Sequence, residues 1–156
     1  MEMFIEVRGS QAYLFFEKLR GVGGLPLGTQ GTVAALIDTP HSLLSAWYLM
    51  RRGCKLLFII SDDAFVEDIR SFENNWDVDF PIVSLSDQKT YYSELQDILM
   101  KNHASAVVTG HVQLTSDSLS EITRLKNQSG YPVLSPLIGL CEKELHKKIV
   151  EVGLSS

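Results

Sequence analysis

The sequence predicts an α/β fold in which a doubly wound, mostly parallel sheet of five strands has helices on both faces and follows a β-hairpin. Beyond residue 31, five short apolar runs alternate with five longer amphipathic ones. Because neighbouring parallel strands need a crossover, this alternation predicts helical connections on both sides of the sheet. The 156 residues, 45% of them hydrophobic, supply one domain of ordinary size with its own core.

The first part of the chain is expected to form the hairpin. Two runs rich in β-forming residues, Phe4 to Val7 and Ala12 to Glu17, flank a Gly-Ser turn. Residues 21–31 then hold five glycines and one proline, a density typical of turns or a linker. We therefore expect a hairpin segment over 1–20, a glycine-rich loop over 21–31 and an α/β domain over 32–156.

The elements of the α/β domain follow from apolar spacing. The strands are expected at residues 32–37, 55–60, 80–85, 104–109 and, as a short one, 132–134. The first helix is expected at 42–52, where Leu43, Leu44, Trp47 and Met50 recur at helical spacing. Ser61 or Asp62 is expected to cap the second helix, which runs to residue 74. The other helices are expected at 89–101, 117–127 and 142–152.

Charge and cysteine content exclude several classes of function. With 14 Lys+Arg against 19 Asp+Glu and no basic block, the domain lacks the charge for holding nucleic acid alone. Cys54 and Cys141 have no partner at metal or redox spacing, so both are expected to be buried. The longest apolar run, Leu56 to Ile60, is too short to span a membrane, and the N-terminus does not resemble a signal peptide. We expect a cytoplasmic protein.

The fold predicts where a ligand binds. Open parallel sheets bind ligands beyond the carboxyl ends of the strands, where strand order reverses, so loops 38–41, 61–63 and 110–116 are the candidates. His41 and His111 lie in two of these loops, and Asp38 could orient one imidazole for acid–base chemistry near neutral pH. Asp38 and His41 are the candidates for catalysis. The alternative is that both histidines are solvated loop residues.

Two further polar groups allow two interpretations each. Asp62 and Asp63 could hold Mg²⁺ beside a phosphate, or they could cap the following helix. Residues 115–118 could contact a phosphate through hydroxyl groups, or Ser118 could cap a helix with Glu121 completing the box. We favour the capping interpretation for both and expect no resident metal site.

Four segments carry a family resemblance. Residues 23–31, GGLPLGTQG, resemble the GGLPxGTxG segment of the tRNA 4-thiouridine synthase family, also called the thiamine biosynthesis sulfurtransferase family. Residues 48–53 resemble that family's YLMMKRG, residues 106–110 its ALVTGE, and residues 131–140 its LPVLRPLIGM. The resemblance follows the chain in order over nearly its whole length.

The resemblance implies a PP-loop ATP pyrophosphatase fold of the adenine nucleotide alpha hydrolase type, which adenylates a tRNA uridine before sulfur transfer. The family's SGGxDS loop binds pyrophosphate through backbone N–H groups at a helix start. Here residues 36–42, LIDTPHS, contain no glycine, and Pro40 removes one donor. ATP or AMP, with Mg²⁺, is then the expected ligand of a weakened pocket. Its expected nucleotide-binding residues are Ile37, Asp38, Thr39, His41, Ser42, Gly110, His111 and Ser116.

The chain departs from the family in other ways. His111 replaces the glutamate of VTGE, and neither cysteine stands where the family uses a thiol. Members also carry RNA-binding domains ahead of the hairpin, so tRNA is expected as a partner only with additional domains. Phe4, Tyr13, Phe15 and Phe16 give the hairpin an aromatic surface through which we expect a homodimer.

We therefore expect a catalytically degenerate PP-loop domain that acts as a nucleotide-binding or scaffold module in tRNA modification, and not as an enzyme. Two alternatives remain open. One is an active ATP-dependent tRNA sulfurtransferase that uses Asp38 and Ser42 in a shortened loop. The other is a structural dimerisation module.

Overall fold

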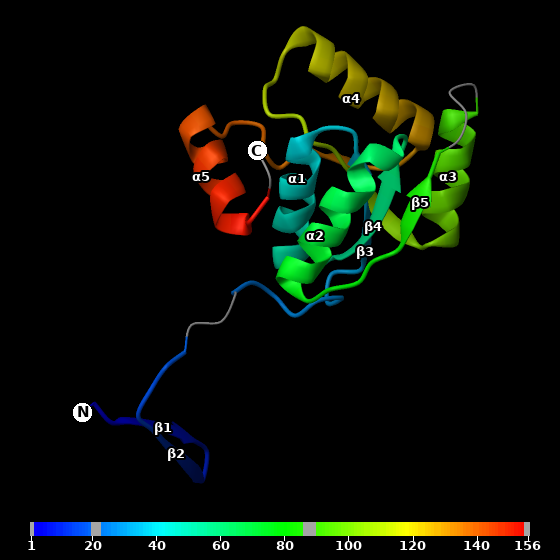
Figure 1. Cartoon of the computed structure of the whole chain (residues 1–156). Helices are drawn as coiled ribbons and strands as arrows, with labels where there is room; N and C mark the ends of the chain where they lie inside the picture. The colour runs from blue at the N-terminus through cyan, green and yellow to red at the C-terminus, as the bar shows by residue number, and fades with distance from the viewer. Residues whose placement is uncertain (1, 20–22, 86–89, 155–156) are drawn as a thin grey trace.

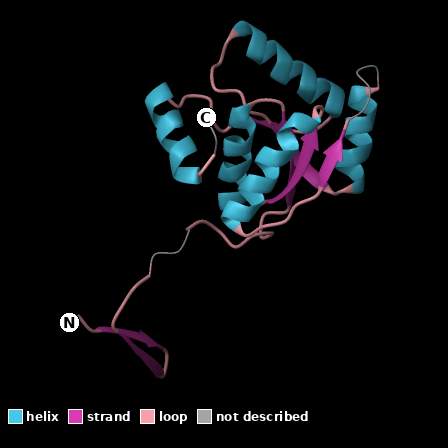
Figure 2. Ribbon diagram, in the orientation of Figure 1, coloured by secondary structure: helices cyan, strands magenta, loops and turns pink. Residues whose placement is uncertain are grey.

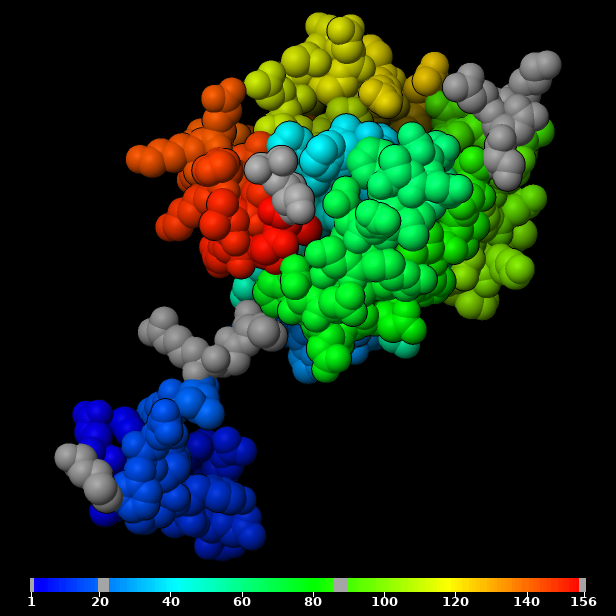
Figure 3. All heavy atoms as spheres, in the orientation of Figure 1, coloured from blue at the N-terminus to red at the C-terminus, as the bar shows by residue number. Residues whose placement is uncertain are grey.

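The chain begins with an antiparallel hairpin. The computed structural model describes residues 2–19, 23–85 and 90–154. Strands β1 (Phe4–Arg8) and β2 (Gln11–Phe15) pair around a tight turn in which Gly9 has a φ of +59°. The hairpin lies apart from the α/β unit (Figures 1 and 3), and most of its large side chains are exposed. The expected division of the chain at residues 20–22 lies outside the described residues.

Five parallel strands form the sheet of the α/β unit. They are β3 (Thr32–Ile37), β4 (Lys55–Ile60), β5 (Ile82–Ser84), β6 (Ala104–Val108) and β7 (Val133–Leu134). Their order across the sheet is β5-β4-β3-β6-β7, and every pairing is parallel. The predicted fold class, a parallel five-stranded α/β sheet after a hairpin, is confirmed.

Helices cover both faces of the sheet (Figure 2). Alternate residues of β3 belong to two separate cores, because successive side chains of a strand point to opposite faces. Val33, Ala35 and Ile37 pack with α1 (Pro40–Arg51), α2 (Val66–Trp76) and α5 (Glu142–Val152). Ala34 and Leu36 pack with α3 (Tyr91–Lys101) and α4 (Ser116–Ser129). This places β3 at the centre of the domain.

The ends of two helices differ from expectation in an informative way. A 3-10 turn, Asp63–Phe65, precedes α2, and the Asp62 carboxylate accepts a hydrogen bond from the backbone N–H of Ala64 at 2.9 Å. Asp62, one of the two expected caps, therefore caps this turn, whereas α2 itself begins after Phe65 without a side-chain cap. Helix α4 is capped by Thr115, and Ser118 sits at its third position instead of at the cap. The expected start of α3 at residue 89 lies outside the described residues.

The two cysteines occupy different environments. Cys54 is buried, as expected, and its burial raises the pKa of the thiol. Cys141 is exposed, contrary to expectation, because it stands at the cap position of α5. Among the described residues, no helix is both long and apolar enough to cross a membrane.

Candidate functional site

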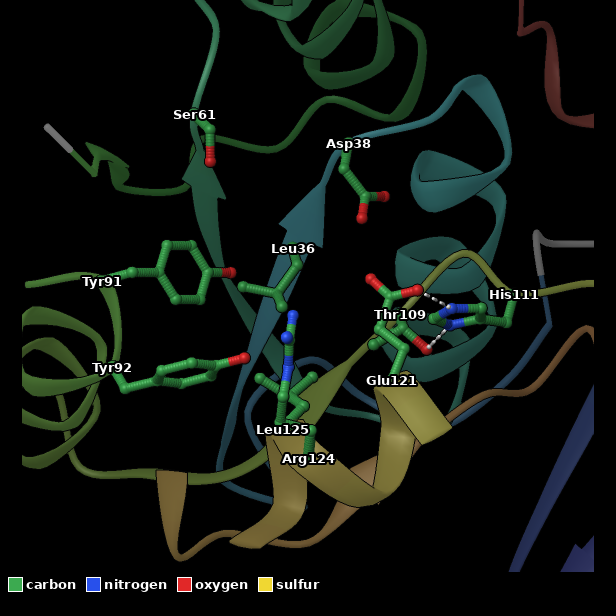
Figure 4. Close-up of a pocket in the computed structure, with 10 residues that line it drawn as sticks. All are labelled: Leu36, Asp38, Ser61, Tyr91, Tyr92, Thr109, His111, Glu121, Arg124 and Leu125. Atoms are coloured by element: carbon green, nitrogen blue, oxygen red, sulfur yellow. Dashed lines mark hydrogen bonds and ion pairs between the residues drawn. The ribbon is translucent and has the colours of Figure 1, made fainter. Parts of the chain in front are cut away.

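The strand order reverses between β3 and β6. From β3 the chain adds β4 and β5 on one side, and then β6 and β7 on the other. A pocket of about 500 Å³ opens at the carboxyl ends of these strands, at the edge where the fold predicts a ligand. It is lined by Leu36, Asp38, Ser61, Tyr91, Tyr92, Thr109, His111, Glu121, Arg124 and Leu125 (Figure 4).

Each wall of the pocket comes from a different element. Leu36 belongs to β3 and Asp38 directly follows that strand, whereas Tyr91 and Tyr92 are the first residues of α3. In Figure 4 the Asp38 carboxylate, the Tyr91 hydroxyl group and the Arg124 guanidinium extend from three sides toward the same space. An apolar floor with a few convergent polar groups is typical of a small-molecule site.

The loop between β3 and α1 satisfies its own hydrogen bonds. The Ser42 hydroxyl group donates to Asp38 Oδ1 at 2.8 Å. The same Ser42 oxygen accepts from the backbone N–H of Thr39 at 3.3 Å and of Asp38 at 3.5 Å. Pro40, the first residue of α1, has no N–H to offer. Two backbone donors near the helix start are therefore directed at a side chain of the chain itself.

Gly110 presses the loop after β6 against the start of α1. A Cβ atom built there would lie 2.5 Å from Ser42 Oγ, 2.6 Å from Thr39 Oγ1 and 2.9 Å from the Ser42 backbone N. Gly110 lacks the positive φ of the other described glycines. A glycine is needed here because the backbone approaches Thr39 and Ser42 too closely for a side chain. The two loops thus form one rigid rim beside the pocket.

His111 is the centre of a hydrogen-bonded chain. Its Nδ1 lies 2.9 Å from Thr109 Oγ1, and its Nε2 lies 3.2 Å from Glu121 Oε2. Thr109 Oγ1 also lies 2.8 Å from Ser135 Oγ at the end of β7. Since Glu121 belongs to α4, this chain ties the helix to the carboxyl edge of the sheet. The solvated interpretation does not hold for His111, whose side chain is only 17% exposed.

The opposite wall carries the two tyrosines and Arg124. Desolvation, followed by the charges of Asp38, Tyr92 and Glu121, raises the pKa of Tyr91 to about 12. The Tyr91 hydroxyl group therefore stays protonated and can donate. Arg124 is the cation of the pocket lining, and its guanidinium lies 6.0 Å from the centre of the Tyr92 ring.

The residues proposed from sequence separate into four groups. Asp38 and His111 line the pocket, and Thr39, Ser42 and Gly110 build the rim. His41 and Ser116 are absent from the lining. The side chain of Ile37 is packed in the core. His111 is bonded to Thr109 and Glu121, whereas the Asp38 carboxylate is bonded to Ser42.

Sequence reasoning missed the tyrosine pair and the α4 residues of the pocket. Glu121, Arg124 and Leu125 follow helical spacing, so they share one face of α4. The spacing could have identified these residues, but only if the face of the sheet that α4 covers had been known. Among the described residues, no group of three or more His, Cys, Asp or Glu side chains could hold a metal ion.

Comparison with known proteins agrees with this architecture. No protein-family model matches the chain. A tRNA sulfurtransferase of Pyrobaculum aerophilum is 32% identical, with 98% of this chain and 38% of the relative covered. A probable tRNA sulfurtransferase of Methanobrevibacter smithii is 27% identical over 98% of this chain and 49% of the relative. The chain is a homologue of the tRNA sulfurtransferase family. It spans about half or less of the length of these relatives.

A solved structure has the same fold over nearly the whole chain. The crystal structure of PH1313 from Pyrococcus horikoshii superposes with a TM-score of 0.71 and 26% identity, covering 97% of this chain and 51% of that one.

The alignment with the M. smithii sulfurtransferase runs over 187 residues, although this chain has 156. The relative therefore contains residues that have no counterpart within the aligned part of this chain.

Proposed function

We propose that this chain is a PP-loop-like module of the tRNA sulfurtransferase family that keeps a nucleotide-sized pocket but does not adenylate. The observation that carries the proposal is the loop after β3, which has no glycine. Its Ser42 hydroxyl group takes the Thr39 N–H that a phosphate would use. An implied pyrophosphate does not fit this loop, so we derive no adenylation step.

Sulfur transfer has no nucleophile at the pocket in this proposal. A thiolate is the reactive form of cysteine, and burial raises the pKa of Cys54. Cys141 is exposed, but it lies against the loop that precedes α4 and does not line the pocket. We therefore infer a nucleotide-binding or scaffold role in tRNA modification, with tRNA bound through additional domains and the protein in the cytoplasm.

Calorimetric titration with ATP and AMP, each with and without Mg²⁺, tests the nucleotide part of the proposal. We expect measurable heat that Tyr92→Ala removes, because Tyr92 offers the ring on which a base would stack. Tyr131→Ala serves as a control, because Tyr131 packs on the same core but does not line the pocket. Absence of heat at millimolar nucleotide would remove nucleotide binding from the proposal.

A second candidate function is an active sulfurtransferase. The curated relatives that bear this name favour it, and Asp38 and Ser42 are both present. The two readings differ in one product, since adenylation releases pyrophosphate from ATP. Detection of that product decides between them.

A third candidate is a dimerisation module built on the hairpin. Phe4 and Phe15 stack on one face, with the Lys18 amine 4.3 Å from the Phe4 ring centre. The register places Ile5, Val7 and Leu14 together on the other face, where each is more than half exposed. We propose this apolar face as the contact, in place of the aromatic surface named from the sequence. A two-stranded hairpin is barely stable alone, so we propose a second copy as its cover.

Sedimentation equilibrium tests the hairpin dimer. We expect the native chain to be dimeric and Val7→Lys to be monomeric. Gln11→Lys, on the opposite face, is the matched control and should leave the dimer intact. A native chain that sediments as a monomer would count against the dimer.

A further inference from the structure

The position of an anion at the start of α1 already holds a carboxylate of the chain. Asp38 Oδ1 accepts from Ser42 Oγ, and its carboxylate points into the pocket (Figure 4). Thr39 and Ser42 form the capping box of α1, and Gly110 leaves no space beside them. A phosphate entering here would meet the Asp38 charge where a phosphate loop offers free N–H groups.

A second carboxylate of the pocket reinforces this discrimination. It belongs to Glu121, whereas the cation Arg124, which would attract a phosphate, lies beside the Tyr92 ring, 6.0 Å from its centre. Desolvation, followed by the charges of Asp38, Tyr92 and Glu121, raises the pKa of the Tyr91 hydroxyl group, so both carboxylates act on the same space as this group. In a partly desolvated site a phosphate near two carboxylates is disfavoured, whereas a neutral hydroxyl group can donate to either.

We propose that the pocket selects an unphosphorylated nucleoside over the corresponding nucleotides, with the ribose hydroxyl groups on Asp38 and Glu121 and the base on the Tyr92–Arg124 pair. This inference rests on the proposed nucleotide-sized site and names its ligand class. Stacking on an aromatic ring with a nearby guanidinium suits a nucleobase. Carboxylates accept hydrogen bonds from sugar hydroxyl groups, but they repel each added phosphate.

A comparison of the affinities of three ligands that share one base tests the proposal. Adenosine, AMP and ATP are titrated into the full chain by calorimetry without Mg²⁺ at one salt concentration. We expect AMP to bind at least tenfold more weakly than adenosine, and ATP more weakly than AMP. Nucleotides that bind as tightly as adenosine would overturn the selectivity and leave the proposed nucleotide site standing. Absence of heat from all three would remove the site itself.

A charge-neutral variant isolates the group responsible. Asp38→Asn keeps an oxygen that accepts from Ser42 but removes the charge. We expect it to narrow the ratio of adenosine to AMP affinity at least threefold. Asp97→Asn, on the exposed face of α3, changes the net charge equally and should leave the ratio unchanged. An unchanged ratio in Asp38→Asn would contradict the role of Asp38.

Discussion

Gly110 joins the two loops that form the rim of the pocket, so replacing it tests that geometry. In Gly110→Ala the new methyl group would lie 2.5 Å from Ser42 Oγ, about 0.9 Å short of the 3.4 Å at which ordinary contact begins. Rotating the Ser42 side chain cannot relieve the contact, because the Ser42 backbone N lies only 2.9 Å from the same point. Helix α1 or the loop after β6 must therefore move.

The expected loss combines two effects of known size. Overpacking of a closely packed site costs about 1–3 kcal/mol, and disruption of a helix cap costs about 1 kcal/mol. We expect Gly110→Ala to lower the free energy of unfolding by about 2–4 kcal/mol, measured by urea denaturation followed by circular dichroism. Because Asp38 is held through Ser42, we also expect weaker binding of whichever nucleoside or nucleotide the native pocket takes.

Gly130→Ala is the matched control. Gly130 caps the end of α4 at a φ of +75°, with no other atom within 4 Å of its expected Cβ. Gly130→Ala therefore reports only the cost of a side chain in left-handed backbone, and we expect it to lower the free energy of unfolding by about 1 kcal/mol. If Gly110→Ala is as stable as the native chain, or loses no more than Gly130→Ala, then the rim is not the close-packed unit described above.

Three further outcomes follow from the contacts of single groups. Glu73 is buried, and its carboxylate accepts from the backbone N–H of Phe80 at 2.8 Å. Glu73→Ala should therefore destabilise the fold by about 1–3 kcal/mol in urea denaturation, and a neutral effect would contradict the bond. Ultraviolet titration should show one tyrosine that ionises near pH 12. This ionisation should be absent from Tyr91→Phe, and its pKa should be lower in Asp38→Asn. A bond from the backbone lowers the pKa of Glu144, so its stabilising contribution is present above its unfolded pKa and lost as pH falls through the folded value. In Glu144→Gln the free energy of unfolding should fall less steeply as the pH is lowered. An unchanged dependence on pH would show that this carboxylate does not contribute to stability.

The architecture was predictable because it depends on local signals. The buried strands read as continuous apolar runs, and β3 and β4 match their expected limits, residues 32–37 and 55–60. Strand β5 is shorter than the expected 80–85, because only Ile82–Ser84 pairs with β4. Apolar residues indicate burial, whereas the limits of a strand depend on its register with the neighbouring strand, which the sequence alone does not give.

The site was predictable only in part. The loops after β3 and β6 were found because chain topology brings strand ends to one edge, and this located Asp38 and His111. Glu121 was expected to complete a helix cap, but its carboxylate pairs with His111 instead. Tyr91 and Arg124 enter the pocket from helices that cover one face of the sheet. Which side chains of those helices reach the edge depends on packing between distant elements.

Release of pyrophosphate from ATP shows whether the loop after β3 can hold a pyrophosphate. We expect that it cannot, because Ser42 Oγ takes the Thr39 N–H and the Asp38 carboxylate is bonded to the same hydroxyl group. The full chain is incubated with ATP, Mg²⁺ and unmodified tRNA, and pyrophosphate is measured with a coupled enzyme assay. We expect no release above the protein-free background. Sustained release beyond one equivalent per chain would contradict it and establish the chain as an adenylating enzyme.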